Sequence, residues 1–335
     1  MASQYAADNE NKEIIQLLLD SVGIADYSFY QCTKMTEMTI PPSVTSIGKF
    51  AFCKCSNLSQ VTIPSSVASI GNDAFRSCLS LKQVEIPSSV NSIENSTFEE
   101  CSSLEKVTIF PNTTRIEERA FFKCNSLIQI TIPSTVTKIG SSAFYQCSSL
   151  EKVTIPSSVN FIGDCAFFRC SSIEEIALPF SLNSIEVSLF AQCSELKKVT
   201  IPVSVKEIKE KAFFGCSSLL DIEIPSSVTE IGASAFTRCS SLTKIKIPSS
   251  LVEIKEKVFS ECLSLKEILI PSSVTSIGCF AFFSCTSLTE IKIPPSVTTI
   301  SQNSFQKCSS LRHISIPSSL ISLISFPNET IVEII

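Results

Sequence analysis

The stretch CSSLEKVTI occurs twice in this chain, at Cys101–Ile109 and again at Cys147–Ile155, 46 residues apart. Half of that distance is 23, and steps of 23 residues from Cys101 reach a cysteine every time, from Cys32 to Cys308. These positions hold 13 of the 16 cysteines, and a phenylalanine stands three residues before each of them. A fixed period of this length predicts an array of stacked structural repeats, in which each repeat contacts mainly its neighbours.

Each repeat contains a short alternating segment that predicts a β-strand. In one example Leu81, Val84 and Ile86 fit inward positions, while Gln83 and Glu85 fit outward ones. A proline follows and ends the strand, because it cannot donate a ladder hydrogen bond. An Ala-Phe-x-x-Cys segment then suggests about one helical turn. Several repeats share a turn glycine, consistent with positive φ, although Glu, Lys or Ser stands there in others; these glycines are Gly48, Gly71, Gly140, Gly163, Gly232 and Gly278.

The repeated phenylalanines and cysteines are best explained as one core position per repeat, here named the Phe–Cys ladder. Metal binding would need clustered thiolates rather than a line of them. Disulfides between in-register cysteines would need Cβ atoms closer than the ~4.8 Å between strands. We therefore expect buried thiols that act as small apolar side chains, with Cys53, Cys165 and Cys279 off the ladder. The ladder includes Phe52, Cys55, Phe75, Cys78, Phe98, Cys101, Phe121, Cys124, Phe144 and Cys147.

Composition excludes several classes of function. The net charge is -5 and no basic patch is present, so nucleic acid is not expected as a partner. No apolar run reaches the length of a membrane span, and the N-terminus lacks the features of a secretory signal. The single histidine, His313, fits an outward strand position, and no nucleotide-binding or metalloprotease motif occurs. We expect a protein that is not an enzyme and that needs no cofactor or metal.

The repeat pattern L-x-x-V-x-I-P-x-x-V-x-x-I-G-x-x-A-F-x-x-C resembles the BspA-like, or Treponema-type, leucine-rich repeats. The resemblance extends from about Tyr27 to Leu323. It implies an α/β repeat solenoid: a curved array with a parallel β-sheet on its concave face and short helical turns elsewhere. It also implies proteins that bind other macromolecules and that are often surface antigens of bacteria and parasitic protists.

Three segments are expected along the chain. Residues 1–26 predict an amphipathic helical cap that resembles the second helix of an ankyrin repeat, and a remnant of a longer ankyrin array is the alternative. Residues 27–323 form the solenoid of about 13 repeats. Residues 324–335 predict a C-terminal cap, because the ends of a solenoid need cover.

Two sets of variable residues are candidates for partner binding. Outward strand positions carry polar side chains, which suit either plain β-propensity or a flat surface for a protein or glycan. A second set, here named the aromatic row, falls on consecutive repeats. Its rings either fold over the edge of the core or form an exposed patch for a partner or a second copy of the chain. The strand candidates are Lys106, Gln129, Lys152, Thr108, Thr131 and Thr154, and the aromatic row is Phe122, Tyr145 and Phe168.

Two functional hypotheses follow, both non-catalytic. The first is a surface antigen or adhesin that binds a host or matrix protein, as the family resemblance implies. The alternative is an intracellular scaffold for protein–protein interactions, which the thiols and the ankyrin-like start favour. The two hypotheses imply different locations. The family resemblance implies the cell surface or secretion, whereas the lack of a signal peptide and of a membrane-spanning segment favours the cytoplasm.

Overall fold

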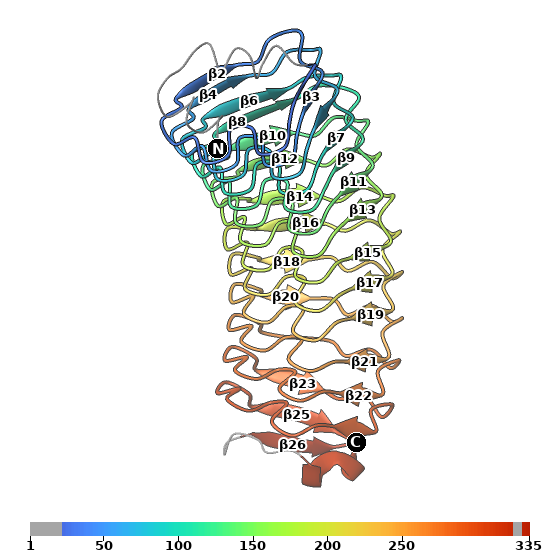
Figure 1. Ribbon diagram of the computed structural model, residues 1–335. Coiled ribbons are helices and arrows are strands. Elements are labelled where there is room, and N and C mark those ends of the chain that lie inside the picture. The colour runs from blue at the N-terminus through green and yellow to red at the C-terminus, as the bar shows by residue number, and fades with distance from the viewer. Residues whose placement is uncertain (1–21, 324–329) are drawn as a thin grey trace. The chain divides into compact units, whose positions relative to one another are not determined.

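The computed structural model describes residues 22–323 and 330–335. The chain divides into two compact units, the first ending at Ile173 and the second beginning at Glu174. Within each unit the repeats are stacked in chain order (Figure 1), and a typical repeat contributes one longer strand and one two-residue return strand. All strand pairings are parallel, as the sequence predicts for a solenoid.

Unit 1 holds one six-stranded sheet and two smaller sheets. The longer strands pair in the order β12-β10-β8-β6-β4-β2, and the return strands pair as β1-β3-β5 and β13-β11-β9-β7. The longer strands are β2 (Glu37–Thr39), β4 (Gln60–Thr62), β6 (Gln83–Ile86), β8 (Lys106–Ile109), β10 (Gln129–Thr131) and β12 (Lys152–Thr154). The return strands are β1 (Gly23–Ile24), β3 (Ser46–Ile47), β5 (Ser69–Ile70), β7 (Ser92–Ile93), β9 (Arg115–Ile116), β11 (Lys138–Ile139) and β13 (Phe161–Ile162).

Unit 2 has the same plan with shorter sheets, paired as β14-β16, β18-β20, β23-β25-β26, β15-β17-β19 and β21-β22-β24. The strands that correspond to the longer strands of unit 1, although β18 and β20 have only two residues, are β14 (Glu175–Ala177), β16 (Lys198–Thr200), β18 (Asp221–Ile222), β20 (Lys244–Ile245), β23 (Glu290–Lys292), β25 (His313–Ile316) and β26 (Ile331–Ile334). The return strands are β15 (Ser184–Ile185), β17 (Glu207–Ile208), β19 (Glu230–Ile231), β21 (Glu253–Ile254), β22 (Ser276–Ile277) and β24 (Thr299–Ile300). One 3-10 helix, η1 (Ser318–Leu323), follows β25.

The strand register matches the sequence period. On β6 Val84 and Ile86 are buried and Gln83 is exposed, as the alternating pattern predicts. Gln83 pairs with Lys106, and Ile86 pairs with Ile109, each 23 residues further on. Each residue therefore lies beside the residue at the same position of the next repeat, and columns of equivalent side chains run along each stack.

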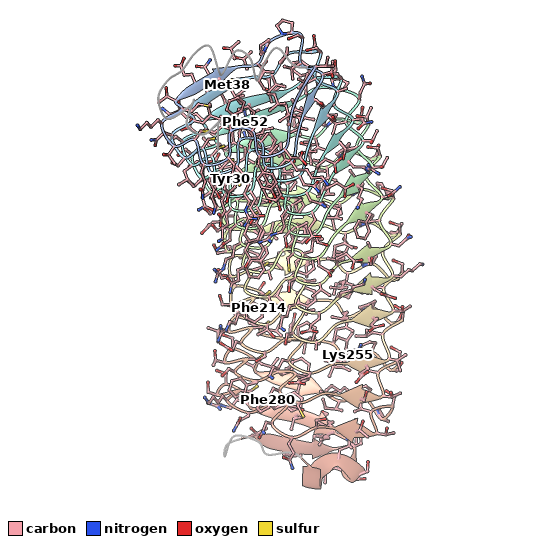
Figure 2. All side chains as sticks on the ribbon, in the orientation of Figure 1. Tyr30, Met38, Phe52, Phe214, Lys255 and Phe280 are labelled. Carbon is pink, nitrogen blue, oxygen red and sulfur yellow. The ribbon has the colours of Figure 1, made fainter. Side chains whose placement is uncertain are left out.

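The interior of each unit is organised by the Phe–Cys ladder. Its phenylalanines are fully buried and stack on one another with ring centroids 5.1–5.8 Å apart, as from Phe52 to Phe75. Figure 2 labels Phe52 in unit 1. The Cys78 thiol donates a hydrogen bond to the Phe52 carbonyl of the preceding repeat at 3.2 Å, and that carbonyl also accepts the Cys55 N–H at 3.1 Å. A cysteine thus fills a small apolar space and also donates to the second lone pair of a buried carbonyl.

The Ala-Phe-x-x-Cys segment differs from the expected helical turn, because it forms tight turns. In each repeat two residues have left-handed φ. One lies five residues before the ladder cysteine, as Phe50 does (φ 56°), and the other lies directly before that cysteine, as Lys54 does (φ 62°). The N–H groups of Phe50, Phe52 and Lys54 donate to carbonyls of the next repeat at 2.7–3.0 Å. A helix would keep those donors within the segment. Each inter-repeat bond contributes about 1 kcal/mol, which offsets the ~1–2 kcal/mol cost of a left-handed residue.

The sequence suggested that the shared turn glycines are needed for positive φ, but the structure shows a different reason. Of the described glycines only Gly215 has positive φ (72°). The six shared turn glycines lie against the backbone of the preceding repeat. A Cβ added to Gly232 would come within 2.4 Å of the Glu210 nitrogen, and one added to Gly140 within 2.5 Å of the Glu118 nitrogen. These glycines are therefore explained by close contact between neighbouring repeats.

Both predicted caps lie partly outside the described residues. The described end of the expected N-terminal helix, Gly23–Ile24, is strand β1, which pairs in parallel with β3. The return strands therefore begin before the predicted solenoid boundary at residue 27. At the other end β26 pairs in parallel with β25, so an additional strand follows the last Phe–Cys pair.

The thiols provide a first test of this core. Every cysteine is a thiol, and of all 16 only Cys279 is exposed and Cys165 half-buried. Burial raises the pKa of Cys101 and Cys308 to about 12 and that of Cys53 to about 11. An aromatic disulfide reagent at mildly alkaline pH should therefore modify Cys279 quickly, Cys165 slowly and the others only after denaturation. A Cys279→Ser variant that keeps the fast phase, or denatured unreduced protein that releases far fewer than 16 thiols, would contradict this arrangement.

A pair of glycine substitutions tests the packing between repeats. Gly232→Ala should lower the free energy of unfolding by about 1–3 kcal/mol, because the new methyl group meets backbone that cannot move aside. Gly215→Ser should lower it by about 1 kcal/mol or less, the lower end of the cost of a left-handed residue, since Ser77 and Ser284 adopt the same conformation at the equivalent position with φ of 56° and 57°. Urea denaturation followed by circular dichroism measures both. The opposite order of effects would show that left-handed φ, and not close contact, decides where glycine is needed.

Candidate interaction surfaces

The strand candidates lie on the six-stranded sheet of unit 1. Lys106, Gln129 and Lys152 are exposed and pair in register across β8, β10 and β12. Thr131 and Thr154 are exposed and in register, and Thr108 on β8 is half-buried. The structure therefore brings these six residues together on one face of one sheet. They form a polar surface with two lysines and no carboxylate among them.

The equivalent column of unit 2 has an apolar interruption. Leu269 is 73% exposed, and it pairs through isolated parallel bridges with Lys246 on one side and Lys292 on the other. The two lysine stems can cover part of the leucine side chain while their ammonium groups stay in water. This face is therefore less uniformly polar in unit 2 than in unit 1.

The aromatic row is a continuous stack in unit 1. The ring centroids of Phe122 and Tyr145 are 4.7 Å apart with planes at 13°, and those of Tyr145 and Phe168 are 4.6 Å apart at 4°. All three side chains are half-buried, so they neither enter the core completely nor stand free in solvent. The stack follows from the register, because each of these residues comes directly after a ladder phenylalanine and repeats after 23 residues.

Basic side chains cover both ends of the aromatic row. The Arg119 guanidinium lies 4.3 Å from the Phe122 ring centroid, and the Arg169 guanidinium lies 5.5 Å from that of Phe168. Arg119 also contacts Glu99 at 3.4 Å, and this carboxylate is almost fully buried. Glu99 thus helps to hold Arg119 over the ring. Cation–π contacts of this kind add about 0.5–1 kcal/mol at exposed sites.

Sequence reasoning missed these basic contacts. The signal was present, because Arg119 precedes a ladder cysteine by five residues and Arg169 precedes another by one. These are the two left-handed positions of the repeat, and the turn brings their side chains beside the ring. Without that backbone conformation, the spacing alone does not indicate where a long side chain lies.

The one histidine of the chain lies on the strand face of unit 2. His313 is exposed on β25 and pairs in register with Glu290 on β23. Within residues 22–323 and 330–335 no three histidine, cysteine or acidic side chains gather in a way that could hold a metal ion. No helix in the part of the chain that the structure describes has the length and apolarity to cross a membrane.

Known proteins share this arrangement of repeats. A leucine-rich repeat protein from Bacteroides ovatus is 28% identical, with 89% of this chain and 92% of that chain covered and a TM-score of 0.54. A leucine-rich repeat protein from Eubacterium ventriosum is 25% identical, with 82% of each chain covered and a TM-score of 0.54. The pneumococcal vaccine antigen PcpA is 20% identical, with 90% of this chain and 80% of that chain covered and a TM-score of 0.55. At this identity the likeness shows a shared fold alone.

The repeat itself matches a known family. The family described as BspA type Leucine rich repeat region, with 6 copies, matches residues 22–150, 102–220 and 206–332, while a search of curated proteins gives no match. The matched residues extend over nearly the whole described chain and include the Phe–Cys ladder, the strand candidates and the aromatic row. The chain belongs to the BspA-type leucine-rich repeat family.

Proposed function

We propose that this chain is a non-catalytic protein-binding member of its family, and that the aromatic row is the centre of its interface. The observation that carries the proposal is the stack of three half-buried rings at 4.6–4.7 Å with basic groups at both ends. Protein interfaces are enriched in aromatic residues and arginine, and a few such residues supply most of the binding free energy.

The polar strand face is a second surface for the same partner or for a glycan. Its lysines and threonines would add hydrogen bonds and orientation, but exposed polar contacts contribute little affinity. We therefore expect the aromatic row to determine affinity and the strand face to adjust specificity.

The partner that we favour is a host or matrix protein, which makes the chain a surface antigen or adhesin. This follows the resemblance to BspA-like proteins. The alternative is an intracellular scaffold. The observation that favours it is the set of sixteen thiols with no disulfide, because thiols of cytosolic proteins remain reduced.

Matched variants test the role of the aromatic row. Phe122→Ser, Tyr145→Ser and Phe168→Ser together should weaken binding to immobilised matrix proteins or host cells by about 30-fold or more, the size of a lost hot spot. The fold should survive, because Ser260 occupies this repeat position in unit 2. The control is Thr108→Ala, Thr131→Ala and Thr154→Ala on the strand face. Loss of binding in the control alone would move the interface to the strands, and light scattering of both variants would reveal self-association through the aromatic row.

Location separates the two partner classes. Antibody labelling of intact source cells, removed by external protease, is expected for a surface antigen. Labelling that needs permeabilised cells would exclude the adhesin and support the scaffold. The same antibody preparation, applied to an internal marker protein, checks that the cells are intact.

A further inference from the structure

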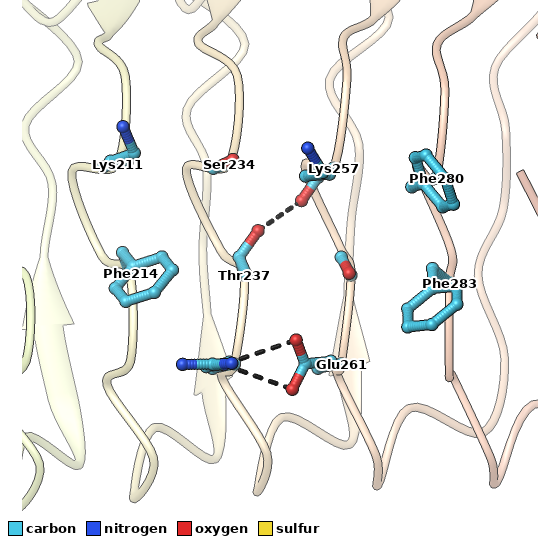
Figure 3. A pocket seen from close by; sticks show the side chains of 10 residues that line it. Lys211, Phe214, Ser234, Thr237, Lys257, Glu261, Phe280 and Phe283 are labelled. Atoms are coloured by element: carbon cyan, nitrogen blue, oxygen red, sulfur yellow. Dashed lines mark hydrogen bonds and ion pairs between the residues drawn. The ribbon is translucent and has the colours of Figure 1, made fainter.

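A surface hollow of about 420 Å³ lies on unit 2, in the same repeat position as the aromatic row of unit 1. Figure 3 shows Phe214 at one end and Phe283 at the other, with Thr237 in between. Thr237 and Ser260 occupy the two intermediate repeats and are buried, so they form the floor. The hollow is named here the Phe214–Phe283 hollow.

The hollow has the dimensions of two missing aromatic rings. Phe214 and Phe283 are three repeats apart, which corresponds to about 14 Å at the strand spacing of ~4.8 Å. In unit 1 the equivalent position carries Phe122, Tyr145 and Phe168, whose rings stack 4.6–4.7 Å apart. The same spacing places two rings between Phe214 and Phe283. The chain supplies Thr237 and Ser260 at those points and leaves the space unfilled.

The end of the hollow at Phe283 is held in place by a second ring. Phe280 packs edge to face on Phe283, with centroids 5.6 Å apart and planes at 79°. Lys257 lies 5.6 Å from the Phe280 centroid. This fixed edge-to-face pair gives an incoming ring a wall to pack against, which lowers the entropy that binding would cost.

Cations predominate among the charged groups that line the hollow. The lining contains three cationic side chains, Lys211, Arg238 and Lys257. It contains one carboxylate, Glu261, which Arg238 contacts through Nε at 3.2 Å and 3.3 Å. The two lysines are paired with their exposed sequence neighbours Glu210 and Glu256. Exposed pairs of this kind contribute at most about 1 kcal/mol, so acidic groups of a ligand can replace them.

We propose that the Phe214–Phe283 hollow binds a segment of a partner protein that presents two aromatic side chains flanked by acidic residues. In an extended segment alternate side chains are ~6.7 Å apart. Phe214 and Phe283 are about 14 Å apart, so two such rings placed between them each lie ~4 Å from the nearer phenylalanine. This distance is close to that of optimal van der Waals contact. The flanking carboxylates then reach Lys211 and Lys257. This site is separate from the aromatic row, and its test does not depend on the function proposed above.

A direct binding measurement is available because the chain contains no tryptophan. The probe is a capped peptide, Glu-Trp-Glu-Trp-Glu, whose fluorescence is followed during titration with the full chain. Binding should shift the tryptophan emission to shorter wavelength. A peptide with leucine in place of one tryptophan should bind about tenfold more weakly, and one with lysine in place of glutamate should bind more weakly as well.

Filling the hollow from within is the decisive variant. Thr237→Phe with Ser260→Phe should complete the row and weaken peptide binding by about tenfold or more. The matched control is Gln306→Phe, which adds a ring in the same column beyond Phe283 and should leave binding unchanged. Circular dichroism checks the fold. If the filled variant does not fold, Phe283→Ser removes one wall and should weaken binding to a similar degree.

Two results would overturn the proposal. One is a peptide that gives no emission shift at millimolar concentration of wild-type chain. The other is a folded filled variant, or Phe283→Ser, that binds the peptide as tightly as the wild type does. Loss of matrix or cell binding in the aromatic-row variants, with peptide binding retained, would show that the two surfaces act independently.

Discussion

The constraint on which this structure depends is that each side chain must pack against its own equivalent one repeat away. Parallel strands in register repeat every ~4.8 Å, and the buried phenylalanines meet that spacing with offset stacks at 5.1–5.8 Å. A ring suits this arrangement because offset stacking is favourable between identical rings. The cysteine beside it fills the remaining space and satisfies a carbonyl of the neighbouring repeat. Once this column is fixed, the register of every other column follows.

Much of the fold could be predicted from the sequence because the period and the strand alternation are both strong. The alternation predicts that Val84 and Ile86 point inward and Gln83 outward, and the structure confirms it. The left-handed turns could not be predicted, because the two positions carry no consistent turn residue: Phe50 and Lys54 occupy them in one repeat, and Asp73 and Ser77 occupy them in the next. Their conformation is imposed by hydrogen bonds to the next repeat. The need for the turn glycines is equally hard to see in the sequence, because it comes from close contact with the backbone of the preceding repeat.

The candidate surfaces, like the fold, are only partly predictable from the sequence. The stacking of Phe122, Tyr145 and Phe168 follows from their spacing alone. The position of Arg119 over a ring does not, because it depends on the left-handed turn and on the buried carboxylate of Glu99. The hollow of unit 2 is visible in the sequence only once the column is known to be aromatic, when Thr237 and Ser260 become an interruption between two phenylalanines.

The inter-repeat hydrogen bonds also bear on how the chain reaches this structure. Ladder partners are separated by 23 to 26 residues in a chain of 335, as for Phe52 with Phe75 and with Cys78. A separation of 23 residues is short in a chain of 335, and proteins whose contacts are local in sequence fold faster than β-sandwiches, whose strand pairings are distant. An all-parallel β-protein of this kind avoids the slow search for distant strand partners. It can begin folding at any pair of repeats and extend by one repeat at a time, including during synthesis.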